Sequence, residues 1–393
     1  MNIGIVTTWF ERGAAYVSRA YLESLENEGH KVYIYARGGE YMAKGDSKWN
    51  TENVTWGKKL RGNNINRNHF FKWILKNKLN TILFNEQNNY YILYLTKEQF
   101  PDIKLVAYVD YYTEDSLALF NVYDFVICNT KRHMQALDQH PQPFYLKWGT
   151  DVNLFKPTEI QKDQITFFHS VGMSNRKGTD ILVNAFITGN LYEKSKLIIH
   201  TQIPIEKVCK YKKSELEKYN VEIIEKTVTA PGLYHLGDIF VYPTRLDGLG
   251  LTMFEALACG LPVITTNYPP MNEIIDNTVG RMVNIERNYA RKDAYYWPMS
   301  ICSTDSLINC MMEYVNNPNL LAKQKEEARK RAENDYDWAS HSKELSSIFT
   351  NATIRKIDEK VMLQIKKKYY RGNIGDFLRE SELATRIFGL IRK

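Results

Sequence analysis

Residues 236–264 read LGDIFVYPTRLDGLGLTMFEALACGLPVI, and the order of patterns within this run indicates the class of fold. Ile239 to Tyr242 is a short apolar run typical of a buried strand. A loop with two glycines follows, then a helical pattern that Gly260 and Pro262 end. Val263 to Thr265 reads as the next strand. Strand, helix and strand in this order predict a βαβ unit and therefore a parallel sheet.

The loop between the first strand and the helix carries the candidate chemistry. Glycines at 248 and 250 let the backbone approach a ligand closely, and the first amides of a helix carry partial positive charge, which favours a phosphate. Asp247 and Glu255 flank this position, and two carboxylates suit the hydroxyls of a sugar or ribose. A first-turn acid that only stabilises the helix dipole is the alternative for Glu255. The donor-binding candidates here are Gly248, Leu249, Gly250, Leu251 and Thr252.

The same alternation of strand and helix patterns extends over most of the chain. Five candidate strands come first: Asn2 to Val6, Lys31 to Ala36, Thr81 to Phe84, Leu105 to Val109 and Phe125 to Cys128. After a polar stretch at 157–164, five more follow: Ile165 to Val171, Leu197 to His200, Val221 to Ile224, Ile239 to Tyr242 and Val263 to Thr265. This pattern predicts two doubly wound sheets in series, with ligands at the carboxyl ends of the strands.

Composition excludes several other classes of protein. The 393 residues are 44% hydrophobic and 25% charged, which is ordinary globular usage and excludes global disorder. The five cysteines are scattered and include no Cys-x-x-Cys pair, so we expect a reducing, cytoplasmic location and no zinc site. We expect neither a signal peptide nor a transmembrane helix, because no apolar run is long enough.

The positive charge is concentrated in two segments. Residues 351–393 hold 11 basic and 5 acidic residues, so six of the seven net charges belong there. Residues 53–85 contain seven cations and no acid, interleaved with aromatic residues. Such segments can form a solvated face, bind an anionic membrane surface or bind nucleic acid. Nucleic acid is the least favoured of the three, because no recognition module accompanies the basic tail.

Together these motifs resemble retaining glycosyltransferases of the GT-B fold, family four, also called glycosyl transferases group 1. The run from Asp247 resembles the family's signature of two Glu residues separated by seven positions, with Asp in place of the first Glu. Other matching segments occur in the same order along the chain: GHKV at 29–32, WGTDVNLFKP at 148–157, RKGTDILVNAF at 176–186, LGDIFVYPT at 236–244 and DWASHSKEL at 337–345.

The resemblance implies roles for particular residues. Arg176 and Lys177 would hold the diphosphate of the donor, Glu255 its ribose and Asp247 its sugar, with Gly172 also at the donor. Gly13 and Ala14 lie in a glycine-containing loop that would contact the acceptor or the sugar. For Gly13, a turn with positive φ is an equally good interpretation.

This chain departs from the family at three positions. Gly172 is followed by Met173, where the family has Arg, so Arg176 or another cation must replace that guanidinium. Asp110 stands where the first domain usually has a histidine. Asp247 is one methylene shorter than the Glu it replaces.

A metal-binding alternative rests on Asp335-Tyr336-Asp337, which matches the Asp-x-Asp motif of the other glycosyltransferase fold. That motif should follow a buried strand, whereas here it follows a charged helix, so helix capping explains it better. His169, His200 and His235 have no metal-ligand spacing, and we expect them to be structural. No metal ligand is therefore predicted, and no cofactor other than the nucleotide-diphosphate sugar as donor substrate.

The predicted fold is α/β, of GT-B type: two doubly wound Rossmann-like domains facing across a cleft, with C-terminal helices. The expected domains are 1–157 on the acceptor side, 158–348 for the nucleotide sugar, and a basic helical tail, 349–393, that returns to the first domain. In that tail, Ile354, Ile357, Val361 and Ile365 predict one amphipathic helix.

The expected function is metal-independent transfer of a hexose from a nucleotide-diphosphate sugar to an acceptor hydroxyl, with retention, in glycan or polysaccharide assembly. The acceptor would be a glycan or a lipid-linked molecule, and the enzyme would be cytoplasmic and peripheral on the inner membrane face. A nucleotide-sugar epimerase and a non-catalytic nucleotide-sugar-binding subunit are the alternatives.

Overall fold

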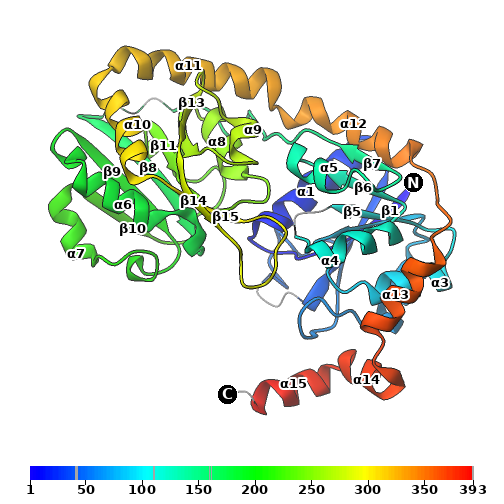
Figure 1. The fold of residues 1–393 in the computed structure, drawn as a ribbon. Helices are drawn as coiled ribbons and strands as arrows, with labels where there is room; N and C mark the ends of the chain where they lie inside the picture. The colour runs from blue at the N-terminus through cyan, green and yellow to red at the C-terminus, as the bar shows by residue number, and fades with distance from the viewer. Residues whose placement is uncertain (40–42, 109–110, 159, 161, 392–393) are drawn as a thin grey trace. The chain divides into compact units, whose positions relative to one another are not determined.

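The structure is a computed structural model that describes residues 1–39, 43–108, 111–158, 160 and 162–391. It divides into two compact units (Figure 1). Unit 2 is one continuous stretch, Lys147–His341, whereas unit 1 combines Met1–Leu146 with Ser342–Lys393. The first boundary therefore lies 11 residues before the expected one at 157, because this stretch pairs with unit 2: Thr150 forms a β-bridge with Asp337.

Unit 1 is built on a seven-stranded sheet in which all neighbouring strands are parallel. The strand order is β3-β2-β1-β4-β5-β6-β7. The strands are β1 (Asn2–Thr7), β2 (Lys31–Ala36), β3 (Val54–Trp56), β4 (Thr81–Asn85), β5 (Lys104–Tyr108), β6 (Phe125–Cys128) and β7 (Pro143–Tyr145). The five expected strands are present, while the edge strands β3 and β7 were not predicted because each has only three residues.

Helices connect these strands, and four more elements follow from the end of unit 2. The connecting helices are α1 (Gly13–Asn27), α2 (Arg67–Lys76), α3 (Tyr91–Gln99), α4 (Glu114–Leu117) and α5 (Lys131–Ala136). The later helices are α12 (Trp338–Asn351), α13 (Glu359–Tyr369), α14 (Gly372–Arg379) and α15 (Glu382–Ile391).

Unit 2 repeats the architecture with a six-stranded parallel sheet in the order β10-β9-β8-β11-β12-β13. Its strands are β8 (Ile165–Gly172), β9 (Ser195–Thr201), β10 (Val221–Glu225), β11 (Ile239–Tyr242), β12 (Val263–Thr266) and β13 (Gly280–Val283). A separate antiparallel pair, β14 (Ile285–Tyr289) and β15 (Met299–Cys302), follows. The helices are α6 (Thr179–Thr188), α7 (Lys213–Leu216), α8 (Leu251–Ala258), α9 (Met271–Ile274), α10 (Thr304–Asn316) and α11 (Pro318–Asp335).

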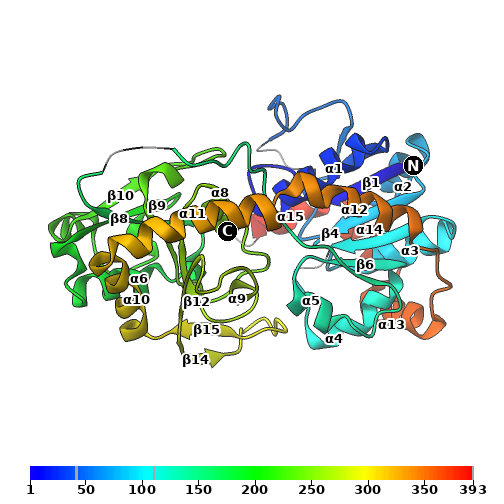
Figure 2. The same cartoon turned by 90° about the horizontal axis from the view of Figure 1, so that it is seen from above.

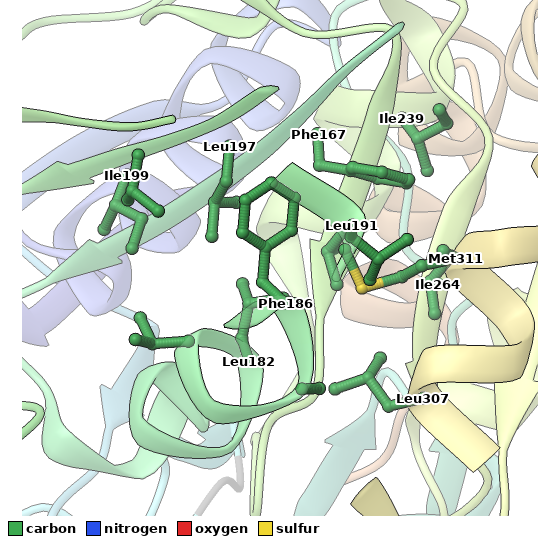
Figure 3. Packing of buried hydrophobic residues seen from close by; sticks show 14 of the residues in the cluster. Phe167, Leu182, Phe186, Leu191, Leu197, Ile199, Ile239, Ile264, Leu307 and Met311 are labelled. Atoms are coloured by element: carbon green, nitrogen blue, oxygen red, sulfur yellow. The ribbon is translucent and has the colours of Figure 1, made fainter. Parts of the chain in front are cut away.

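The core of unit 2 lies between its sheet and the helices on one face. Phe167 from β8 and Phe186 from α6 are both fully buried, and Leu307 and Met311 of α10 close the cluster (Figure 3). On the charged helix α11, Ala328 and Ala332 are buried where the helix packs along α8 (Figure 2). Burial on both faces explains why the strands of this sheet are almost continuously apolar.

The tail packs on unit 1 through polar as well as apolar contacts. Lys104 on β5 donates to the carbonyl oxygens of Phe349 and Ala352, at 2.7 and 3.0 Å. The expected helix over residues 354–365 is only partly right, because α13 begins at Glu359 and Ile354, before it, is 48% exposed. Val361 and Ile365 do bury their side chains, as the apolar stripe predicted.

No helix in the described part of the chain combines the length and the apolar composition that a membrane span requires.

Candidate nucleotide-sugar site

The candidate residues of unit 2 come together where the strand order of the sheet reverses. Strands β8 and β11 are neighbours at the centre of the sheet, although β9, β10 and the helices α6 and α7 lie between them in sequence. Parallel sheets bind ligands outside the carboxyl ends of the strands at this switch point. The 3₁₀ turn Asn175–Lys177 follows β8, and the loop from Pro243 to Gly250 follows β11, so both lie at this edge.

Gly178 holds these two loops together. Its φ is +75°, and a Cβ atom at this position would lie 2.0 Å from the carbonyl oxygen of Pro243. No side chain fits there, so glycine permits the close approach. The backbone amide of Arg245 also donates to the carbonyl of Arg176 at 2.8 Å. The position of Lys177 beside the second loop is therefore set by the backbone.

Lys177 and Asp247 form an ion pair at the switch point. The Lys177 Nζ lies 2.5 Å from Asp247 Oδ2, and the two side chains are only 17% and 16% exposed. Tyr242, at the end of β11, donates its hydroxyl to the same carboxylate oxygen and accepts from Lys177. The three side chains form one hydrogen-bonded group, and Tyr242 was not among the predicted site residues.

Burial and pairing act in opposite directions on the charges of this group. Burial alone would lower the pKa of Lys177, but Asp247 and Tyr242 outweigh it and hold that pKa above the usual value. Burial would raise the pKa of Asp247, but Lys177 above all, with Tyr242 and Arg176, holds it well below the usual range. Burial and Asp247 raise the pKa of Tyr242 to about 12. At neutral pH the group is thus an ammonium, a carboxylate and a neutral phenol.

Asp247 also fixes the loop that begins α8. Its Oδ1 accepts from the backbone amide of Gly250 at 3.1 Å, and Gly250 adopts a φ of +81°. Within the described residues, no acceptor contacts the backbone amides of Leu251 and Thr252, and the buried Thr252 hydroxyl has no partner. These unoccupied donors at the N-terminus of α8 are suited to an anion.

Glu255 lies in the second turn of α8, where the first turn holds no acid. Helix-dipole stabilisation of the first turn therefore does not explain it. The Tyr234 hydroxyl donates to Glu255 Oε2 at 2.5 Å, and within the described chain no protein group donates to Oε1. Burial raises the pKa of Glu255, which the bond from Tyr234 only partly offsets. One carboxylate oxygen is thus held in place and the other is available to a ligand.

The other predicted donor contacts lie around this centre. Arg176 has its Nε 3.4 Å from the Ser174 hydroxyl, and its guanidinium forms no ion pair within the described residues. Gly172, with a φ of +60°, ends β8 beside it. Arg245, which was not predicted, pairs with Asp180 at 2.6 Å.

The candidate residues of unit 1 occupy the matching position in their own sheet, after β1. Gly13 and Ala14 begin helix α1, so the expected loop at 13–15 is wrong, and the φ of Gly13 is not in the left-handed range. The Ala14 carbonyl accepts from Asn85 at the end of β4, 2.8 Å away. Asp110 lies outside the described residues.

His169 and His200 have structural partners, while His235 lines the cavity of unit 2. His169 is fully buried between the Val241 carbonyl, at 2.7 Å, and the Thr179 hydroxyl, at 3.0 Å, and burial lowers its pKa to about 4. In the described part of the chain, no three His, Cys, Asp or Glu side chains are grouped as metal ligands. Asp337 accepts from the amide of Ala339 at 3.2 Å, as expected of a helix cap.

Unit 2 also has a cavity of about 980 Å³, which is separate from the group of candidate donor residues. It opens at the end of α8 and the start of β12, which is the opposite edge of the sheet from Lys177, and its lining includes Cys259, Gly260 and Leu261. None of the predicted donor residues lines it. The convergence of polar groups, rather than the size of the hollow, marks the candidate site.

In a comparison with protein families, a model described as glycosyl transferases group 1 matches residues 162–292. Among curated proteins, the O-antigen biosynthesis glycosyltransferase WclY of Escherichia coli is 27% identical over 133 residues, 32% of this chain and 35% of that protein. A probable sucrose-phosphate synthase of Thermosipho melanesiensis is 24% identical over 200 residues, 42% of this chain and 44% of that protein. The matches thus span less than half the length of these relatives.

Solved structures match almost the whole chain. Sucrose-phosphate synthase from Thermosynechococcus elongatus has a TM-score of 0.71 and 16% identity, and the match covers 89% of this chain and 98% of that one. The Anabaena protein HepE, solved in complex with UDP-glucose, has a TM-score of 0.67 and 15% identity, with 89% and 99% covered. At these identities the likeness establishes the fold, which confirms the expected pair of Rossmann-like domains.

Proposed function

We propose that this chain is a glycosyltransferase. Its residues 162–292 match the model of the glycosyl transferases group 1 family, and its two Rossmann-like units have the GT-B fold. It moves a hexose from a nucleotide-diphosphate sugar to an acceptor hydroxyl in glycan assembly. One observation carries the proposal: Lys177, Asp247 and the free donors of α8 converge at the switch point of the sheet that the family model covers.

The first task of the site is to stabilise the departing diphosphate. Negative charge develops on this group as the bond from the sugar to the phosphate breaks, and fixed donors aimed at that charge lower the barrier. Arg176, which has no carboxylate partner among the described residues, and Lys177 supply the cations. The amides of Leu251 and Thr252 add donors that contact no acceptor in the described ranges of the chain.

The two carboxylates have different roles in this proposal. Glu255 keeps Oε1 available and would accept from a ribose hydroxyl, while Tyr234 holds its other oxygen. Asp247 is already engaged through both oxygens, by Lys177, Tyr242 and Gly250. Its contact with a donor-sugar hydroxyl therefore uses a remaining lone pair, and its larger contribution is to position Lys177.

The remaining features of the proposal concern stereochemistry, metal and acceptor. We infer retention of the anomeric configuration from the resemblance to family four, with the donor phosphate taking the acceptor proton. The reaction proceeds without a metal, since the cations and amides already neutralise the leaving group. The acceptor is a glycan or a lipid-linked molecule, and for the latter the enzyme works in the cytoplasm at the surface of a membrane.

A screen of nucleotide sugars tests the function. The purified protein is incubated with each donor, with and without candidate acceptors, and released nucleoside diphosphate is measured. We expect release with at least one donor, its loss in Glu255→Ala, and no change when EDTA is added. Activity that EDTA abolishes and only a divalent ion restores would refute the metal-free mechanism.

Two outcomes would replace the proposal by its alternatives. Conversion of the donor alone to an epimer would identify an epimerase. Binding of donors by calorimetry, without release of nucleoside diphosphate in any mixture, would identify a non-catalytic binding subunit.

A further inference from the structure

We propose that helices α14 and α15, together with the adjoining segment 58–67, form a surface that binds an anionic lipid bilayer. We call this surface the tail face. Its apolar side chains are Ile374, Phe377, Leu378, Leu383, Ile387 and Phe388. Lipid binding is measured separately from sugar transfer, so either proposal can fail alone.

The tail face exposes more large apolar side chains than a folded surface normally does. Ile374 is 78% exposed, Phe377 70% and Leu383 68%. In α14 the exposed apolar residues are three and four positions apart, and in α15 Leu383 and Ile387 are four apart, so each helix presents one apolar side. Both helices lie at the edge of unit 1 (Figure 1). So many exposed apolar side chains on two consecutive helices mark a binding surface.

The acids of these helices point toward the protein. Asp376 is 1% exposed and pairs with Arg379 at 2.6 Å. Glu380 accepts from the backbone amide of Arg67 at 3.1 Å, and Glu382 accepts from the backbone amide of Lys59 at 2.9 Å. The carboxylates that would repel an anionic surface are therefore bound on the inner side.

Cations, in contrast, remain on the outside. Arg386 lies next to Ile387 on the exposed side of α15. Four more exposed cations precede α14: Lys366, Lys367, Lys368 and Arg371. None of these five forms an ion pair with a carboxylate in the described part of the chain. The outer side thus combines apolar side chains with positive charge, and the three carboxylates of α14, α15 and the residues between them are each engaged by a protein donor.

The fold also brings the two basic segments of the sequence together. Besides the contacts of Lys59 and Arg67, the Asn66 side chain donates to the carbonyl of Glu380 at 2.9 Å. Lys58 lies 3.7 Å from Glu382, and Arg61 is exposed in the same segment. Residues more than 300 positions apart therefore build one basic and apolar surface.

Charge decides which partner this surface fits. In a symmetric dimer the same patch meets itself, so the cations of one copy would face those of the other without acids between them. Anionic headgroups complement the cations, while the apolar side chains enter the boundary between headgroups and acyl chains. A bilayer is therefore the occupant that satisfies both properties of the tail face.

Vesicle flotation tests the proposal with the full chain. Vesicles of phosphatidylcholine alone are compared with vesicles in which about a third of the lipid is phosphatidylglycerol, at about 0.05 M and about 0.5 M salt. We expect binding to the anionic vesicles at low salt, about tenfold weaker binding at high salt, and little binding to the neutral ones.

Two variants separate the apolar contribution from the charge. Phe377→Ser with Leu383→Ser removes exposed apolar groups and should reduce binding about tenfold. Lys367→Glu with Arg386→Glu should reduce it at low salt but little at high salt. Leu154→Ser, at a residue 43% exposed in unit 2, is the matched control and should bind like the parent. Circular dichroism melting checks that each variant is folded.

Three outcomes would overturn the proposal. The first is that the parent protein stays unbound with anionic vesicles at low salt. The second is that the Phe377 and Leu383 double variant binds as well as the parent. The third is a concentration-dependent dimer in light scattering that this double variant abolishes, without vesicle binding by the parent, which would assign the tail face to a second copy.

Discussion

Replacing the acid of the Lys177–Asp247 pair should strengthen the binding of a nucleoside diphosphate, although that acid belongs to the site. In the donor-free protein, Lys177 is bound to Asp247 at 2.5 Å. A diphosphate that recruits Lys177 must therefore compete with a carboxylate and also approach its negative charge. Asp247→Asn removes both obstacles and keeps the shape of the side chain.

The magnitude follows from the burial of the pair. Removing one partner of a fully buried ion pair costs roughly 3 to 5 kcal/mol. Because Lys177 and Asp247 remain 17% and 16% exposed, solvent screening reduces the effect. We expect about 1.4 kcal/mol, which corresponds to a roughly tenfold lower Kd for the nucleoside diphosphate, for which UDP serves as the probe. The same variant should unfold more easily without ligand, since Lys177 loses its counter-charge.

Isothermal calorimetry with UDP and with uridine measures this effect. UDP has no sugar on its diphosphate, so a contact between Asp247 and the donor sugar does not enter the comparison. Uridine should bind the parent and Asp247→Asn equally, because it lacks the phosphates. Transfer activity should fall, since Lys177 is no longer held by Asp247 and Tyr242.

Asp276→Asn is the matched control. It removes a carboxylate from another ion pair of unit 2, that of Asp276 with Arg331 at 3.1 Å, and should leave UDP binding unchanged. Weaker UDP binding by Asp247→Asn, or an equal change for uridine, would refute the reasoning.

Four further predictions concern neighbouring groups. Lys177→Ala with Arg176→Ala should weaken binding of UDP far more than of uridine in the same calorimetry; equal losses would mean that the cations are structural. Glu255→Ala should slow turnover by raising the activation free energy by about 2 to 4 kcal/mol, because a charged hydrogen bond is lost. Unaltered steady-state kinetics would show that Glu255 does not belong to the site. The pKa of Glu255 is raised in the folded protein, so ionisation of this carboxyl lowers the stability of the fold as the pH rises through that pKa. Glu255→Gln should therefore melt at a higher temperature than the parent at neutral pH, and at the same temperature below about pH 4. Gly178→Ala should lower the free energy of unfolding by about 2 to 4 kcal/mol in denaturant titration, because a Cβ would strike the Pro243 carbonyl and occupy a strained φ; a change below about 0.5 kcal/mol would contradict the close approach.

The central strands were predictable because their burial leaves a plain pattern in the sequence. Ile239–Tyr242 has the expected bounds, and its four residues are buried on both faces of a parallel sheet. The edge strands gave no such signal: Val54–Trp56 is only half-buried and three residues long. Short pairing at an edge depends on the neighbouring strand more than on local pattern.

Contacts between side chains were harder to predict than positions. The sequence placed Lys177 and Asp247 after different strands of one sheet, but their separation of 70 residues does not indicate that they pair. Tyr234, which holds Glu255, lies in a 3₁₀ turn with no distinctive spacing. The role of Tyr242 could have been predicted from the sequence. It is the last residue of a central strand, and a polar group at the carboxyl end of such a strand faces the edge of the sheet where ligands bind.

The boundary between the units was misplaced for a similar reason. Trp148 belongs to unit 2 because its ring lies 4.4 Å from that of Trp338, almost 200 residues later in the chain. Composition marked the polar stretch after Pro157 as a linker, but composition does not report which distant ring a tryptophan meets.

The division of unit 1 into two stretches has a consequence for synthesis on the ribosome. Unit 2 is continuous and can fold as it emerges, whereas unit 1 lacks Ser342–Lys393 until all of Lys147–His341 has been made. At roughly 5 to 20 residues per second, this delay is on the order of 10 to 40 s. During that time Asp124, which later accepts from the Arg355 amide at 2.8 Å, and the rest of the surface under the tail are uncovered. The nascent first sheet is therefore the stage at which we expect this chain to depend most on chaperones.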